Sequence, residues 1–264
     1  MLAKEEHNSK HEGKSMKKAN IFKISLMLLA VTLSTAARAD SLHRFIYTNI
    51  SDTVTQPKGK NALNYRFWLE DWDENGWTTK VIRNDLTYRF GLSDHTEVGI
   101  NQMHSSCLYW YNRYYWWGTI SGFNDLQLYG KHQILNEPDS PVTVSIGGRV
   151  FAPTGSTKGF SGREWRTGEF VALSKEVGSW RLAGHVGWQD NGNSRWTDYY
   201  YWGAGAIQKD SGLNLEIIGS DNYLQGLIGV TQGSTDGYIQ YGLMIPMDGS
   251  DMDWRFIFGL GLSF

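Results

Sequence analysis

Large apolar residues occupy every second position over the last eleven residues of the chain. Trp254, Phe256, Phe258, Leu260, Leu262 and Phe264 alternate with Arg255, Ile257, Gly259, Gly261 and Ser263. Because successive side chains of a strand point to opposite faces, this period of two predicts a β-strand with one apolar face. A soluble sheet would have to cover such a face with another layer, whereas a transmembrane barrel turns it towards lipid.

The same alternation recurs along the chain from residue 63 onward. The apolar faces are formed by Leu63, Tyr65, Phe67 and Leu69; Ile82, Leu86, Tyr88 and Phe90; Val98 and Ile100; Leu126, Leu128 and Ile134; Val142, Val144, Ile146 and Val150; Trp180, Leu182, Val186 and Trp188; and Leu213, Leu215 and Ile217. Segments 163–175, 198–209, 224–232 and 235–245 are also strand-like, without a clearly defined face. We therefore predict an all-β, antiparallel, up-and-down transmembrane barrel of about twelve strands.

The connections between these strands alternate in length. Short turns are predicted at 91–94, 137–140, 176–179, 209–212 and 233–237, and longer loops at 71–79, 104–122, 153–162, 189–197 and 246–252. Outer-membrane barrels have short periplasmic turns and longer outer loops, and this pattern fits with both chain ends in the periplasm. A soluble β-sandwich or a lipocalin-like barrel also gives alternating strands, but it does not explain the alternation in loop length.

The first 39 residues resemble a secretory signal peptide. A basic segment follows Met16, an apolar run covers 24–33, and Ala37 and Ala39 form a small-residue cleavage site before Asp40. The apolar run is shorter than the roughly 20 residues that a helix needs to span a bilayer, which argues against a membrane anchor. Residues 1–15 are interpreted as an artefact of an upstream start. We expect a signal peptide at 1–39, a periplasmic lead-in at 40–60 and the barrel at 61–264.

Composition agrees with a secreted barrel and excludes several function classes. Aromatic residues make up 14% of the chain and there are 30 glycines, which suits strands, tight turns and aromatic girdles. Residues 1–39 hold seven of the 25 basic and three of the 27 acidic side chains, which leaves 18 and 24 and a net charge of −6. This charge predicts no nucleic-acid partner. Cys107 is the only cysteine, so no internal disulfide is possible.

Charged residues dominate the face opposite the apolar one. The predicted inward-facing set is Arg66, Glu70, Arg83, Asp85, Arg89, Glu97, Asp125, Lys131, Arg149, Arg181, Glu216 and Arg255. Charges of both signs in a lumen can line a water-filled path and select solutes by charge. They can equally pair with one another and close a narrow barrel, because buried charges persist only when paired. Both interpretations stay open at this point.

The segment 108–117 is unusually rich in Tyr and Trp. We predict a mouth loop in which Tyr109, Trp110, Tyr111, Trp116 and Trp117 either stack on a sugar or aromatic ligand or form part of an interfacial girdle. His104 and Cys107 lie beside this segment, but two ligands are too few for a closed metal site. We therefore expect no metal and no cofactor.

An outer-membrane phospholipase or acyltransferase is the enzyme alternative. It would need a Ser and a His with a third group to orient the His. Ser145 and His185 qualify by residue type alone, since they lie on different, non-adjacent predicted strands and no local motif accompanies them. We therefore expect no catalytic residues.

Several short motifs occur in an order that resembles a family of outer-membrane transporters named after the meta-pathway of phenol degradation. These motifs are 148–155 (GRVFAPTG) with 159–162 (GFSG), 90–99 (FGLSDHTEVG), 122–126 (GFNDL) with Lys131, and Thr48, Thr53 and 57–59 in the lead-in. The matches run from about Thr48 to Phe264. Asn124, where the family usually has glycine, and the aromatic segment 108–117 depart from the family pattern. The resemblance implies an outer-membrane barrel that transports small, hydrophobic or aromatic compounds, with no particular solute indicated.

Together these observations predict a channel or transporter for small solutes in the outer membrane of a Gram-negative bacterium. A structural or adhesive barrel without transport is the main alternative, and a lipid-modifying enzyme is the weaker one. Phe258, Leu260, Leu262 and Phe264 resemble the C-terminal signal that the outer-membrane assembly machinery reads. The expected partners are therefore outer-membrane lipid, that machinery, periplasmic chaperones and an unidentified small molecule.

Overall fold

The computed structural model describes most of the chain after residue 51. The described ranges are 52–74, 77–111, 116–137, 139–156, 163–190, 198–221, 223–234, 236–248 and 252–264. The predicted signal peptide, with Ala37 and Ala39, and the first part of the predicted lead-in lie outside these ranges. No helix among the described residues is long and apolar enough to cross a membrane.

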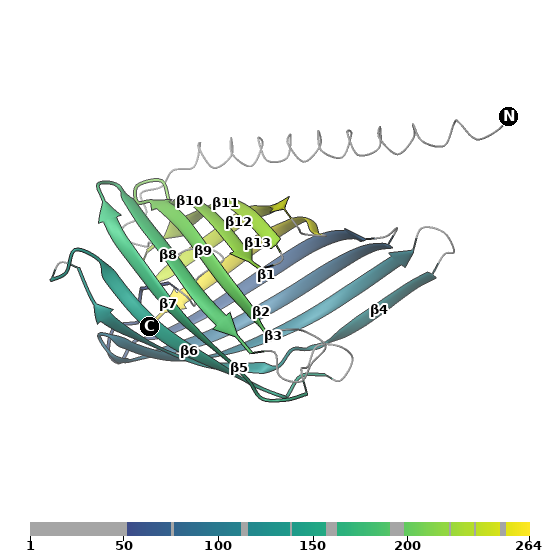
Figure 1. Ribbon diagram of the computed structural model, residues 1–264, viewed down its shortest axis with the longest axis horizontal. Helices are drawn as coiled ribbons and strands as arrows, with labels where there is room; N and C mark the ends of the chain where they lie inside the picture. The colour runs from purple at the N-terminus through teal and green to yellow at the C-terminus, as the bar shows by residue number, and fades with distance from the viewer. Residues whose placement is uncertain are drawn as a thin grey trace. The chain divides into compact units, whose positions relative to one another are not determined.

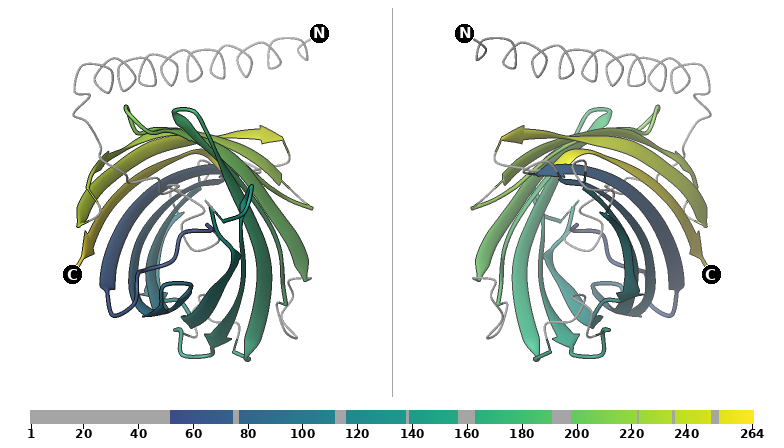
Figure 2. Two further views of the ribbon diagram at one scale, coloured as in Figure 1. Left: turned by 90° about the vertical axis from the view of Figure 1, so that its left-hand side faces the viewer. Right: turned by 90° about the vertical axis from the view of Figure 1, so that its right-hand side faces the viewer.

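Thirteen strands are present in these ranges, and each pairs antiparallel with its neighbours (Figure 1). They are β1 (Asn61–Glu74), β2 (Trp77–Ser93), β3 (Thr96–Tyr111), β4 (Trp116–Phe123), β5 (Leu126–Leu135), β6 (Thr143–Ala152), β7 (Arg166–Val177), β8 (Trp180–Gln189), β9 (Tyr199–Gln208), β10 (Leu213–Ser220), β11 (Tyr223–Gly233), β12 (Gly237–Asp248) and β13 (Met252–Ser263). β1 pairs with β13 from Ala62↔Ser263 to Trp72↔Met252, which closes the ring seen end-on in Figure 2.

β4 and β5 together occupy one position in the ring. β3 pairs with β4 through residues 104–111 and with β5 through residues 96–101. Asn124 lies at the break between β4 and β5, where its side-chain oxygen accepts from Ser105 Oγ and its carbonyl accepts from Gln102 Nε2, both at 2.8 Å. The structure is therefore a closed barrel with twelve strand positions, as the alternation predicts.

The outer surface of the barrel is apolar and its inner surface is largely polar. Along β7, Val171 and Leu173 are 45% and 54% exposed, whereas the intervening Ala172 and Ser174 are buried. A closed barrel has no second layer to cover such side chains, so the exposed apolar positions face lipid.

A charge on this outer face is expected to destabilise the barrel. Val171 lies near the middle of β7, so Val171→Arg places a guanidinium at the level where the bilayer is least polar. The expected loss is about 2–4 kcal/mol of unfolding free energy, measured by urea titration of the protein in lipid vesicles. Val171→Leu is the control. Equal stability of the two variants would mean that this face does not contact lipid.

Three of the predicted long loops are mostly strand. Residues assigned to loops at 71–79, 104–122 and 246–252 extend the hairpins β1–β2, β3–β4 and β12–β13, whose connections are 75–76, 112–115 and 249–251. Tyr, Trp and Thr favour strands, and pairing such as Trp110↔Trp117 satisfies backbone groups that a loop would leave to water. The connections 153–165 and 190–198 remain long.

The inner surface also carries an apolar cluster that the simple alternation did not predict. Trp68, Ile218, Leu227, Met244, Met252 and Ile257 pack together inside the barrel, with Trp72, Met103 and Tyr223 against them. Leu227 is followed by Ile228, and Met244 is preceded by Leu243, so both faces of β11 and β12 are apolar there. A period of two cannot reveal an inner apolar face when the outer face is apolar as well.

Candidate functional site

All twelve predicted inward-facing charges lie inside the barrel. Ten are buried, namely Arg66, Glu70, Asp85, Arg89, Glu97, Asp125, Lys131, Arg181, Glu216 and Arg255. The other two, Arg83 and Arg149, line a cavity inside the barrel. Their positions follow from strand geometry, because each occupies the strand phase opposite to the lipid-facing residues.

Several of these charges pair across neighbouring strands. Arg66 and Asp85 are direct cross-strand partners, with Arg66 Nη2 2.5 Å from Asp85 Oδ2. Glu70 Oε1 lies 2.9 Å from Arg255 Nε and 3.1 Å from Arg83 Nε. Glu70 is directly opposite Arg255 and diagonal to Arg83, and side chains in both relations are close enough to interact, so register brings these groups together. The pairs reduce the cost of keeping charge in the interior.

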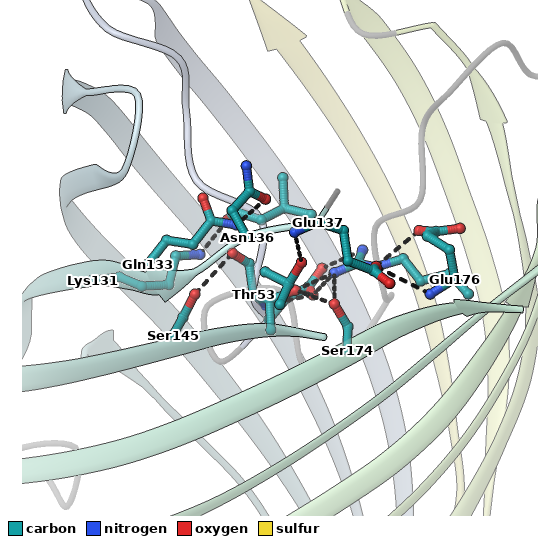
Figure 3. Close-up of polar contacts among 12 residues, drawn as sticks. Thr53, Lys131, Gln133, Asn136, Glu137, Ser145, Ser174 and Glu176 are labelled. Carbon is teal, nitrogen blue, oxygen red and sulfur yellow. Dashed lines mark hydrogen bonds and ion pairs between the residues drawn. The ribbon is translucent and has the colours of Figure 1, made fainter. Parts of the chain in front are cut away.

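The chain preceding β1 enters the barrel, which the sequence did not predict. We call residues 52–60 the luminal segment. Arg181 Nη2 donates to Asp52 Oδ1 at 2.5 Å and Arg181 Nη1 donates to Asp52 Oδ2 at 3.2 Å. Ser174 Oγ lies 2.7 Å from Thr53 Oγ1, and Ser145 Oγ donates to the Thr53 carbonyl at 3.0 Å (Figure 3).

A second group of contacts holds the next part of the luminal segment. The buried carboxylate of Glu97 accepts from the Gln56 backbone N–H at 2.8 Å and lies 3.3 Å from Lys131 Nζ. The same ammonium donates to the Val54 carbonyl. The luminal segment is therefore fixed by charge-assisted hydrogen bonds to both a cation and an anion of the barrel wall.

Close backbone contact completes the anchoring near the short turns. A Cβ on Gly91 would lie 2.0 Å from the Pro57 carbonyl oxygen, so only glycine allows the luminal segment to cross β2 at this point. Gly59 N–H donates to the Gly91 carbonyl at 2.8 Å. These contacts place the luminal segment at the short-turn end of the barrel, which is the periplasmic end in outer-membrane barrels.

Residues 40–60 show no periodic pattern, so the sequence predicts a lead-in that lies entirely outside the barrel. One signal was present in the inward-facing set, which contains seven basic and five acidic residues. An interior excess of two positive charges calls for acidic groups from elsewhere in the chain. Asp52 supplies one of them to Arg181.

A cavity of about 360 Å³ lies inside the barrel, beyond the luminal segment. Its cationic lining includes Arg149 and Arg166, on β6 and β7, and its apolar lining includes Trp68, Ile218 and Tyr223, on β1, β10 and β11. In the ring of twelve positions these two groups of strands are three to five positions apart, and Arg66 and Arg83, on β1 and β2, also line the cavity on the side of Trp68. Such a volume is at the lower end of the range for ligand pockets, about 300–1,000 Å³.

Aromatic rings hold Arg149 in place at the wall of this cavity. Its Nη2 donates to the Tyr201 hydroxyl at 2.6 Å, and its guanidinium carbon lies 5.1 Å from the Tyr201 ring centre and 5.5 Å from that of Phe170. The Tyr201 ring covers Gly187, where a Cβ would lie 2.3 Å from ring atoms. Contacts of this kind between a guanidinium and aromatic rings are attractive, so they hold the Arg149 side chain in position.

The Ser and His of the enzyme alternative do not form a dyad. Ser145 and His185 pair in register with the same residue, Ala172, from its two sides. They therefore lie two strand spacings apart, about 10 Å, and Ser145 donates to the Thr53 carbonyl instead. His185 lines the cavity, where its ring centre is 5.8 Å from that of Tyr201.

His104 and Cys107 are three residues apart on β3, so they point to opposite faces of the wall. His104 Nε2 lies 3.0 Å from Ser121 Oγ on the outer face. The two residues therefore cannot bind the same metal ion.

The five aromatic residues predicted for a mouth loop lie on strands. Tyr109, Trp110 and Tyr111 end β3, and Trp116 and Trp117 begin β4. The loop prediction was therefore wrong for their backbone, while their side chains lie outside the described part of the structure. Whether these rings bind a ligand or form a girdle stays a prediction.

The C-terminal strand forms one side of the closing seam. Leu260, Leu262 and Phe264 are 41%, 60% and 62% exposed on the outer face, in phase with Phe258. Phe264 N–H donates to the Asn61 carbonyl at 3.0 Å and the Phe264 carbonyl accepts from Asn61 N–H at 2.8 Å. The last residue of the chain is thus paired with the first residue of β1.

No family model matches the chain, and no curated protein sequence matches it. Among solved structures, an outer membrane channel from Pseudomonas putida F1 is 17% identical with a TM-score of 0.62, over 81% of this chain and 98% of that one. The transport unit of the autotransporter AIDA-I from Escherichia coli is 10% identical (TM-score 0.45; 79% and 90% covered). Outer membrane phospholipase A from Escherichia coli is 13% identical (TM-score 0.44; 80% and 94% covered).

The closed twelve-position ring and the apolar outer face define the class of this protein. It is an outer-membrane β-barrel of a Gram-negative bacterium, and its fold is shared with the Pseudomonas putida barrel.

Proposed function

We propose that this barrel is a channel for small solutes, including hydrophobic or aromatic ones. The observation that carries the proposal is the cavity of about 360 Å³ inside the barrel, which is lined by both guanidinium groups and apolar side chains. A purely structural barrel does not need such a space, and its interior would be filled by packed side chains. The fold shared with a protein described as an outer membrane channel supports this proposal.

The resemblance to the transporter family named after the meta-pathway of phenol degradation agrees with it. Two of the motifs that carry the resemblance contribute residues to the cavity wall. Asp125 comes from 122–126, and Arg149 and Phe151 come from 148–155. The family membership itself is part of the proposal.

A solute enters from the end with the long connections and reaches the cavity before it reaches the luminal segment. The luminal segment narrows the other end, where Asp52 and Thr53 are bound to the wall. Charged groups in a lumen select solutes by charge, and a segment across the lumen limits their size. The luminal segment therefore forms the narrowest point of the path.

Planar-bilayer recording of the refolded protein tests the channel directly. We expect discrete current steps in potassium chloride, because ions small enough to pass the luminal segment follow the polar side of the lumen. A structural or adhesive barrel gives no steps in the same bilayers. A phospholipase assay on the same preparation tests the enzyme alternative, for which we expect no turnover.

Deletion of Phe264 is expected to lower insertion into the outer membrane severalfold. The deletion removes an exposed apolar side chain and the two backbone hydrogen bonds that join the chain end to Asn61. Insertion is measured as the membrane fraction that resists urea extraction, with Phe264→Tyr as the control that retains the ring. Normal insertion of the deletion variant would exclude an assembly role for this residue.

A further inference from the structure

The cavity in the lumen is amphipathic, and this property indicates the kind of solute it holds. Among its charged lining residues, Arg66, Arg83, Arg149 and Arg166 outnumber Asp85 and Asp125. Resting on the proposed channel function, we propose that the cavity is a binding site for small aromatic carboxylates, with the carboxylate at Arg149 and Arg166 and the ring against Trp68, Ile218 and Tyr223.

The cationic side of the cavity is built to hold its guanidinium groups in fixed positions. Arg149 is bound by the Tyr201 hydroxyl and stacked on two rings. Arg166 lies over the Phe151 ring at 4.9 Å and 3.0 Å from Asp125 Oδ2. A planar guanidinium matches a carboxylate with two parallel hydrogen bonds, and holding it beforehand lowers the entropy cost of binding.

The fold explains why both arginines reach the same cavity. Arg149 and Gly168 are register partners on β6 and β7, and so are Phe151 and Arg166. The break at Asn124 directs Asp125 into the barrel, where its carboxylate also accepts from Gly155 N–H at 3.0 Å. Asp125 therefore fixes Arg166 and the start of the long connection 153–165 together.

The opposite side of the cavity offers apolar side chains to a ring, beside Arg66, whose guanidinium carbon lies 5.5 Å from the Trp68 ring centre. Trp68 and Ile218 belong to the inner apolar cluster, and Met103 and Tyr223 pack against it. Burial of an aromatic ring there gains about 25 cal/mol per Å² of apolar surface removed from water. A carboxylate without a ring lacks the free energy that is gained by burying a ring. A neutral aromatic compound lacks the contact with the arginines.

Calorimetric titration of the folded protein in detergent tests the site without any requirement for conduction. We expect benzoate to bind, and acetate and benzyl alcohol each to bind at least tenfold more weakly. Arg149→Gln should lower benzoate affinity at least tenfold, and Arg149→Lys should cause a smaller loss because it retains the charge. Lys80→Gln removes a charge from an exposed position on β2 and should leave binding unchanged.

Folding of each variant is checked by the shift in electrophoretic mobility on heating. Arg149→Lys keeps the test decisive if Arg149→Gln does not fold. Absence of benzoate binding by the wild type, or equal binding by the Arg149 variants and the wild type, would overturn the site. Current steps in bilayers without benzoate binding would refute the site and leave the channel standing. Benzoate binding without current would refute the channel alone.

Discussion

Planar bilayers containing the variant Asp52→Ala/Thr53→Ala are expected to show a single-channel conductance at least about twice that of the wild type. The two substitutions remove the carboxylate held by Arg181 and the hydroxyl shared by Ser174 and Arg181. Without these contacts the first part of the luminal segment is held to the wall only through the Thr53 and Val54 carbonyls, which accept from Ser145 and Lys131. The lumen at the short-turn end is then wider on average, and more ions pass.

Arg181 keeps a partner in this variant, so the barrel should still fold. Its Nε lies 3.9 Å from Glu176 Oε1, and Glu176 is partly exposed to water. Lys58→Ala is the matched control, because it changes an exposed side chain of the same segment whose backbone N–H donates to Asp94. Equal conductance of the double variant, the control and the wild type would show that the luminal segment does not limit flow.

Of the single substitutions named here, Glu97→Leu is expected to lower the free energy of unfolding the most. Its carboxylate is fully buried and interacts with Lys131 Nζ, Gln56 N–H and the Tyr129 hydroxyl. Removal of the Glu97 carboxylate takes a counter-charge away from the buried Lys131 ammonium, which costs about 3–5 kcal/mol of unfolding free energy. Chemical denaturation in detergent micelles measures this loss.

The double variant Glu97→Leu/Lys131→Leu separates a charge effect from a packing effect. Because both charges are absent, we expect it to be more stable than Glu97→Leu alone by about 1–3 kcal/mol. The Val54 carbonyl loses its donor in the double variant, so recovery is incomplete. A double variant less stable than Glu97→Leu would show that the pair does not act as a unit.

The barrel could be predicted from the sequence because its wall is built from local rules. Most strands carry their own period of two, and Trp254, Phe256 and Phe258 define a face without reference to any other strand. The inward phase of residues such as Arg66 and Asp85 follows from the same rule. The pairing Arg66–Asp85 then needs only the register of one hairpin.

The site needed information that no local pattern contains. Residues 52–56 are bound by groups on β3, β5, β6, β7 and β8, which come together only when the ring closes. The inner apolar cluster is similar, since Trp68 and Ile218 lie on β1 and β10, which are far apart in the chain. The loop predicted at 104–122 is mostly strand because its aromatic residues, which are also found in ligand-binding loops, are strong strand formers.

The central claim is that small solutes cross this barrel, and swelling of liposomes that contain the refolded protein tests it most directly. We expect swelling in an isotonic solution of a small neutral sugar alcohol, faster for Asp52→Ala/Thr53→Ala than for the wild type, and little swelling with a large oligosaccharide. Absence of swelling by both proteins, in liposomes shown to hold folded barrel, would contradict the claim.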